Sequence, residues 1–162
     1  MKTLTIACFL MSLSGLCSSQ SDAPTSLTPE IIFIHMGGSD CPPCTAWRGV
    51  ELPKLQRMEV YKRIKFYKVN KSVKSSVPPR FFLHDDLKPL KEELDRASAG
   101  QDGSAQSIIL VNGKVFDYHL GSHSADELRM IFEAILSGRE SPIPRCSRRQ
   151  NGFCAEQIQP KG

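Results

Sequence analysis

The stretch of sequence that decides the fold spans residues 31–44 and reads IIFIHMGGSDCPPC. A short continuous apolar run followed by two glycines is typical of a strand that is buried on both faces and stopped by a turn. Two cysteines separated by two prolines come next, at the point where a helix is expected to begin. The stretch therefore predicts a buried strand, a turn, and a helix with a CxxC pair at its N-terminus.

Working outward from this stretch, helical spacing of apolar residues predicts three helical segments. The first begins at Pro42, and Pro53 is expected to break or kink it. The second spans residues 85–97, where Pro89 fits only in a first turn. The third spans residues 124–136 and begins with a serine, a residue type that caps helices.

Further strands are predicted over residues 64–69, 107–111 and 114–119. Asn112-Gly113 separates the last two and is the strongest two-residue hairpin signal. The element order is then β-α-β-α-β-β-α. Because helical crossovers make parallel neighbours and a hairpin adds antiparallel ones, this order predicts an α/β fold of three layers, with a mixed central sheet of about four strands flanked by helices.

The first 19 residues have the order of a secretory signal peptide. A lysine at position 2 precedes an apolar run over residues 4–16, which is too short to span a bilayer as a helix, and small polar residues follow. We therefore expect cleavage of residues 1–19 and export, to the periplasm in a bacterium and otherwise by secretion, with no stable membrane insertion afterwards. A lipid anchor at Cys17 and an uncleaved segment are the alternatives.

One folded domain is expected over residues 30–137, because 162 residues with 40% hydrophobic and 23% charged residues suit a single core. Residues 20–29 are polar and read as a linker, and residues 138–162 read as an irregular tail. Signal removal leaves a net charge of +3 in place of +4, without a basic block interleaved with aromatics, so nucleic acid is not expected as a partner. The four remaining cysteines, an even number, fit an oxidising compartment.

The CxxC pair carries the candidate chemistry. The unpaired N–H groups and partial positive charge of a helix N-terminus stabilise a thiolate, so Cys41 is the candidate nucleophile. Cys44 follows on the same helical face and is the candidate resolving thiol, which would close a disulfide with Cys41. Pro42 and Pro43 stiffen the turn between them. Since the cysteines carry the electrons, no bound cofactor is expected.

The same spacing also occurs in zinc sites and in static disulfides. Zinc would need two further ligands, and the remaining cysteines and histidines form no second close pair with ligand-like spacing, so no metal is expected. A metal-binding or metal-delivery protein using Cys41 and Cys44 is the alternative function, and a binding module with a structural Cys41–Cys44 bridge is another. His119 and His123 are expected to lie at the surface.

Four segments together resemble the thioredoxin family over roughly residues 30–137: IIFIHM, the CPPC at a helix start, IKFYKV, and SIILVNGKVFDYHLGSHSADELRMIFEAIL. The resemblance implies a thioredoxin fold and a thiol-disulfide oxidoreductase in which Cys41 attacks and Cys44 resolves. It implies protein thiols and disulfides as substrates, together with an upstream redox partner.

Three positions differ from the family pattern. Ala105 or Gln106 stands where the family has a cis-proline beside the active-site sulfurs, a residue that shapes substrate docking and discourages metal binding. His35 replaces a buried acidic residue; imidazole also exchanges protons near neutral pH, although a strand-end histidine satisfied by hydrogen bonds is the commoner case. Asp40 replaces a tryptophan, and its charge opposes thiolate formation at Cys41.

The tail carries a second cysteine pair. Cys146 and Cys154 are predicted to form a structural disulfide that staples the tail, because Asn151-Gly152 between them is a turn-former. The alternatives are a relay that exchanges electrons with Cys41–Cys44, and free thiols or metal ligands.

Overall fold

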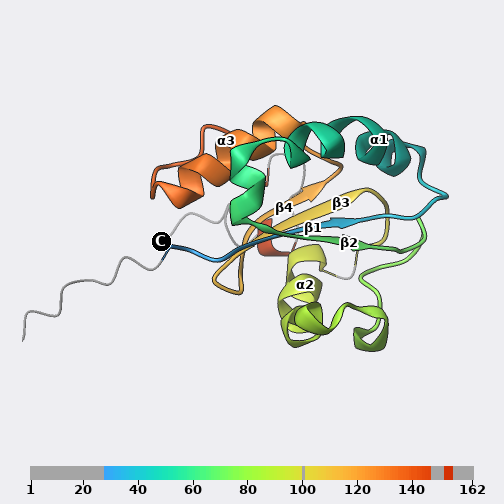
Figure 1. Cartoon of the computed structure of the whole chain (residues 1–162). Helices are drawn as coiled ribbons and strands as arrows, with labels where there is room; N and C mark the ends of the chain where they lie inside the picture. Colours follow the sequence, from blue (N-terminus) through green and yellow to red (C-terminus); the bar gives the residue numbers. More distant parts are fainter. Residues whose placement is uncertain (1–27, 100, 147–151, 155–162) are drawn as a thin grey trace, which may run out of the picture.

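The computed structural model describes residues 28–99, 101–146 and 152–154, and its helices lie on both sides of one sheet (Figure 1). The predicted order of strands and helices is confirmed. The elements are β1 (Ile31–Met36), α1 (Pro42–Gln56), β2 (Lys65–Val69), α2 (Lys91–Ser98), β3 (Gln106–Val111), β4 (Lys114–Leu120) and α3 (Ala125–Leu136). Short 3-10 helices lie between some of them: η1 (Glu59–Arg63), η2 (Arg80–Phe82) and η3 (Asp85–Leu90).

The sheet has four strands in the order β2-β1-β3-β4. β1 pairs in parallel with β2 and antiparallel with β3, which in turn pairs antiparallel with β4. Helices α1 and α3 cover one face and α2 covers the other (Figure 1). The fold is therefore the thioredoxin-like, three-layer α/β architecture that the sequence predicts.

β1 lies in the middle of the sheet, and all six of its residues are buried. Phe33 points to the core under α1 and α3, whereas Ile34 points to the core on the α2 side. A strand that contributes to two cores needs apolar residues in succession, which explains the continuous apolar run. At the C-terminal end of β1 the chain leaves the sheet and enters the CxxC segment.

Two prolines lie at positions that the sequence left open or placed elsewhere. α1 does not break at Pro53 but continues to Gln56. The lost hydrogen bond is the one to the Gly49 carbonyl, which lies at an exposed position where water can replace it. Pro89 lies in η3 and not in the first turn of α2, which begins two residues later at Lys91.

The expected cap of the last helix is present. The Ser124 hydroxyl accepts a hydrogen bond from the Glu127 N–H at 3.3 Å, and the Glu127 carboxylate accepts one from the Ser124 N–H at 2.8 Å. This reciprocal capping box fixes where α3 begins. The segment before it is held to the sheet by the Ser107 hydroxyl, which donates a hydrogen bond to the Gly121 carbonyl at 3.1 Å.

The tail packs on both sides of the sheet. Ile143 joins the core under α1 and α3, and the Arg145 guanidinium lies 4.9 Å from the ring centre of Phe116 on β4. Phe153 and Cys154 are buried in the core on the α2 side. The tail thus crosses from one face to the other at β4, an edge strand, and adds apolar residues to both cores.

The predicted signal peptide (1–19) and residues 20–27 of the predicted linker lie outside the described residues, as do residues 147–151 and 155–162 of the tail. Within the described part of the chain, every helix is too short or too polar to cross a lipid bilayer.

Candidate functional site

Cys41 and Cys44 form a disulfide at the start of α1, and their Cα atoms lie 5.3 Å apart. Cys41 is the N-cap residue, and its Sγ accepts a hydrogen bond from the Cys44 N–H at 3.2 Å. Pro42 and Pro43 occupy the first helical positions, where a missing N–H costs no helical hydrogen bond. Cys41 Sγ therefore lies where the helix N-terminus would stabilise a thiolate.

Both cysteines are nearly inaccessible to solvent, with exposed fractions of 1% for Cys41 and 0% for Cys44. Ala105 packs against the pair, as does the partly buried side chain of Val73. These two residues come from different loops, and we call them the walls of the site because both pack against the cysteine pair. A reagent that attacks Cys41 must first displace atoms that cover it.

The two glycines after β1 provide space that any side chain would fill. A Cβ at Gly37 would lie 2.2 Å from Cys44 Sγ, and a Cβ at Gly38 would lie 2.7 Å from the carbonyl oxygen of Lys71. Non-bonded carbon does not approach other atoms this closely in packed proteins. The two glycines thus do more than turn the chain, because the Gly37 backbone lies against the Cys44 sulfur.

Arg48 fixes this glycine turn from α1. Its guanidinium donates hydrogen bonds to the carbonyl oxygens of Gly37 at 3.2 Å and Gly38 at 3.0 Å. Arg48 lies one helical turn after Cys44 and so faces the same direction. Arg48 was not predicted from the sequence, although its position four residues after Cys44 is the signal that would have indicated it.

Of the two residues considered for the position beside the sulfurs, Ala105 is the one that occupies it. The Ser104–Ala105 peptide bond is cis, and the Ala105 carbonyl accepts a hydrogen bond from the Gly121 N–H at 2.7 Å. Gln106 begins β3 instead, and its side-chain amide donates to the Gly103 carbonyl at 3.0 Å.

Asp40 contacts the loop that carries Val73. Its carboxylate accepts a hydrogen bond from the Val73 N–H at 3.1 Å, and the Val73 carbonyl accepts one from the Gly103 N–H at 2.8 Å. The loop after β2 is thereby connected both to the residue before Cys41 and to the loop before β3.

His35 is fully buried, one residue before the end of β1. Its Nε2 lies 3.1 Å from the Ser122 hydroxyl, and its ring stacks on Trp47 with ring centres 4.3 Å apart. Burial, and secondly the charge of Arg48, lower the pKa of His35 to about 4. The imidazole is therefore neutral at neutral pH, and proton transfer by His35 stays a prediction.

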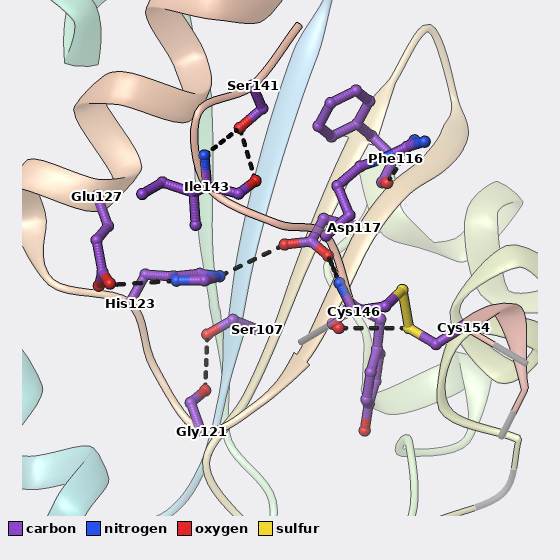
Figure 2. A network of polar contacts seen from close by, with 12 residues as sticks. Ser107, Phe116, Asp117, Gly121, His123, Glu127, Ser141, Ile143, Cys146 and Cys154 are labelled. Atoms are coloured by element: carbon purple, nitrogen blue, oxygen red, sulfur yellow. Dashed lines mark hydrogen bonds and ion pairs between the residues drawn. A yellow bond between two sulfur atoms is a disulfide. The ribbon is translucent and has the colours of Figure 1, made fainter. Parts of the chain in front are cut away.

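The expectation that His119 and His123 lie at the surface is wrong, because each has an exposed fraction of 4%. Their rings pack against each other with centres 4.1 Å apart and planes tilted by 34°. His123 lies between two carboxylates, with Nε2 3.4 Å from Asp117 and Nδ1 3.8 Å from Glu127 (Figure 2). Its carbonyl oxygen accepts a 2.7 Å hydrogen bond from Trp47 Nε1, which ties the loop before α3 to α1.

Asp117 connects this cluster to the tail disulfide. The second oxygen of its carboxylate accepts a hydrogen bond from the Cys146 N–H at 2.9 Å (Figure 2). Cys146 and Cys154 form a disulfide with Cα atoms 5.4 Å apart, and both are buried in the core on the α2 side. Cys41 and Cys44 belong to a different buried cluster, so the two disulfides occupy separate surroundings. Asn151 of the predicted turn lies outside the described residues.

Within the ranges that the structure describes, no three side chains of His, Cys, Asp or Glu converge in a way that could hold a metal ion.

Comparisons with known proteins give similarity to solved thioredoxin structures. No protein-family model matches the chain, and no curated protein matches its sequence. A thioredoxin-2 described as a component of malaria parasite protein secretion machinery is 20% identical, with a TM-score of 0.40, over 63% of this chain and 80% of that one. Trxlp from Edwardsiella tarda is 17% identical, with a TM-score of 0.40, over 61% and 78%. Oxidised thioredoxin from Plasmodium falciparum is 15% identical, with a TM-score of 0.41, over 66% and 82%.

Proposed function

We propose that this chain is an exported thiol-disulfide oxidoreductase that acts on protein thiols and disulfides through Cys41 and Cys44. One observation carries the proposal: the two cysteines form a disulfide across the first turn of α1, with Cys41 at the N-cap. In this position the partial positive charge of the helix N-terminus stabilises the thiolate of reduced Cys41. Cys44 is held close enough to form a disulfide bond with it.

The exchange balances with two thiols and one disulfide. A Cys41 thiolate attacks one sulfur of a substrate disulfide, which forms a mixed disulfide and releases the other substrate sulfur as a thiolate. Cys44, after losing its proton, then attacks Cys41 Sγ, so that the Cys41–Cys44 bond forms and the second substrate thiolate leaves. Two electrons have moved to the substrate. A partner dithiol returns them in the reductive direction, and in the oxidative direction every step is reversed.

Two features support an exported compartment. The first 19 residues have the pattern of a cleaved signal peptide. The described part of the chain also holds a second disulfide, Cys146–Cys154, and disulfides persist mainly in oxidising compartments.

A binding module with a structural Cys41–Cys44 bridge is the second candidate. The observation that favours it is the burial of both cysteines, because a disulfide that reagents cannot reach exchanges slowly. The two candidates differ in the rate and the reversibility with which this one bond is reduced.

Equilibration with glutathione or dithiothreitol buffers, followed by alkylation and mass mapping of each cysteine, measures the reduction potential of the Cys41–Cys44 pair. An oxidoreductase gives reversible exchange and turnover of a disulfide-bonded polypeptide. Cys41→Ser should abolish turnover, whereas Cys44→Ser should accumulate mixed disulfides because the resolving thiol is gone. Equal trapping by both variants would refute these role assignments, and a pair that stays oxidised without turnover would favour the binding module.

A further inference from the structure

We propose that Lys71 is a positioning residue for the exchange reaction, because its buried ammonium group holds together the two loops that form the walls around the Cys41–Cys44 pair. The inference rests on the proposed function and adds to it a residue that the CxxC motif does not contain.

Lys71 lies two residues after β2, and its side chain points into the protein with an exposed fraction of 6%. Its Nζ donates hydrogen bonds to the carbonyl oxygens of Ser75 and Gly103, both at 2.6 Å. The Ser72 carbonyl and the Ser104 hydroxyl lie at 3.3 Å. A buried ammonium group is tolerated only where its donors are satisfied, and here acceptors from two loops meet at one cation.

Each of these loops carries one wall of the site. Val73 lies between the residues that Lys71 contacts in the first loop, and Ala105 follows Gly103 and Ser104 in the second. Both side chains pack against Cys41 and Cys44. The loops also bond to each other directly, since the Gly103 N–H donates to the Val73 carbonyl. A change at Lys71 therefore reaches both walls without touching either cysteine.

The second loop needs such an anchor for a physical reason. Alanine at position 105 has no ring to fix its φ angle. Gly103 adopts a φ of +99°, which glycine reaches without steric cost, but glycine does not restrict the backbone to that conformation. Charge-assisted hydrogen bonds are stronger than neutral ones and so suit this task. Burial lowers the pKa of Lys71, while the charges of Asp102 and Asp40 act in the opposite direction and favour the ammonium form.

The test compares Lys71→Met with Lys74→Met in the full chain. Both variants lose one lysine charge in the same loop, but the Lys74 side chain is exposed. Two substrates are used: a disulfide-bonded polypeptide, which is large enough to contact the loops that cover Cys41, and dithiothreitol, a small reagent that needs only to reach a sulfur. For Lys71→Met we expect kcat/KM for the polypeptide to fall about ten- to a hundredfold, because a small displacement of the groups that position a substrate lowers the rate by this factor. The rate of reduction by dithiothreitol should not fall.

Hydrogen exchange gives a readout that separates positioning from general destabilisation. In Lys71→Met the amide of Gly103 should exchange faster, while the amide of Ile109 in the core of β3 should keep its wild-type rate.

Equal losses with polypeptide and dithiothreitol, or equal behaviour of Lys71→Met and Lys74→Met, would overturn the positioning role. If Lys71→Met does not fold, Ser104→Ala takes its place, because it removes one acceptor and leaves the carbonyls; a selective loss with the polypeptide supports the proposal and no loss overturns it. A wild-type protein inactive with both substrates would instead refute the proposed function.

Discussion

Gly37 lies so close to Cys44 that a Cβ at position 37 would be 2.2 Å from the cysteine sulfur. The backbone of the turn after β1 is therefore part of the surface that encloses the disulfide. Arg48 holds that backbone in place through the carbonyl oxygens of Gly37 and Gly38. The geometry of the CxxC pair thus depends on residues outside the motif, and this dependence can be tested.

Gly37→Ala should destabilise the oxidised protein by about 1–3 kcal/mol, the usual cost of an overpacked core. The reduced protein should lose less, because a free Cys44 thiol can rotate away from the new methyl group, so the reduction potential of the pair should rise. Denaturant unfolding of both redox states measures the two effects. Gly49→Ala is the control: nothing lies within 4 Å of its Cβ, and alanine in a helix should stabilise by about 0.5–1 kcal/mol. Equal behaviour of the two variants would contradict the contact.

The stability of the protein should fall in acid partly because of His35. Its pKa is about 4 in the folded state and 6.5 as a free group. Above pH 6.5 neither state holds the proton; as the pH falls from 6.5 to 4, the unfolded chain takes up a proton that the folded protein does not, so unfolding becomes easier. The loss attributable to this group is about 3 kcal/mol.

Denaturant unfolding at pH 7 and pH 4.5 compares the wild-type protein with His35→Gln, in which this acid-dependent loss should be smaller. His84→Gln is the control, because it removes an exposed imidazole in place of a buried one, and its difference between the two pH values is compared with the wild-type difference. If His35→Gln kept that difference as well, His35 would not be the buried neutral group described above.

Arg48→Met should raise the pKa of His35, because the charge of Arg48 is the second cause of its depression after burial. Burial remains in the variant, so the value should stay below 6.5. NMR titration of the His35 ring measures the shift directly, and Arg57→Met, which removes an exposed charge near the end of the same helix, is the control. An unchanged pKa in Arg48→Met would mean that Arg48 acts only as a hydrogen-bond donor to the glycine turn.

The periodicity of the sequence was enough to predict the element order, the buried β1 and the capped α3, since each depends on residues close together in the chain. The burial of Asp117 and His119 was not predictable in this way. A β-bulge between β3 and β4 pairs Leu110 with Val115 but Ile109 with Asp117, so one extra residue enters β4 and changes which side chains face α1 and α3. Alternation counted along the sequence does not reveal where such a residue is inserted.

The site shows the same division. Cys41 and Cys44 were identified because motif and helix start coincide in the sequence. Lys71 was not identified, because its role comes from the parallel pairing of β1 with β2, which brings the chain after β2 to the edge of the sheet where the CxxC pair lies. Contacts between loops that are far apart in the sequence leave no periodic signal.

Replacement of both tail cysteines, as Cys146→Ala with Cys154→Ala, should lower the free energy of unfolding by about 2–3 kcal/mol through the lost cross-link, because the closed loop is short. The bond joins residues 8 positions apart in the sequence. Phe153, next to Cys154, lies in the core on the α2 side, and the Cys146 N–H donates a hydrogen bond to Asp117. Turnover of a disulfide-bonded polypeptide should persist, since Cys41 and Cys44 lie in a separate cluster. Chemical denaturation and the exchange assay measure the two quantities, and wild-type protein with only the tail bond reduced is the control. Loss of turnover with unchanged stability, together with a peptide linking Cys41 to a tail cysteine in the wild type, would instead identify the tail pair as an electron relay.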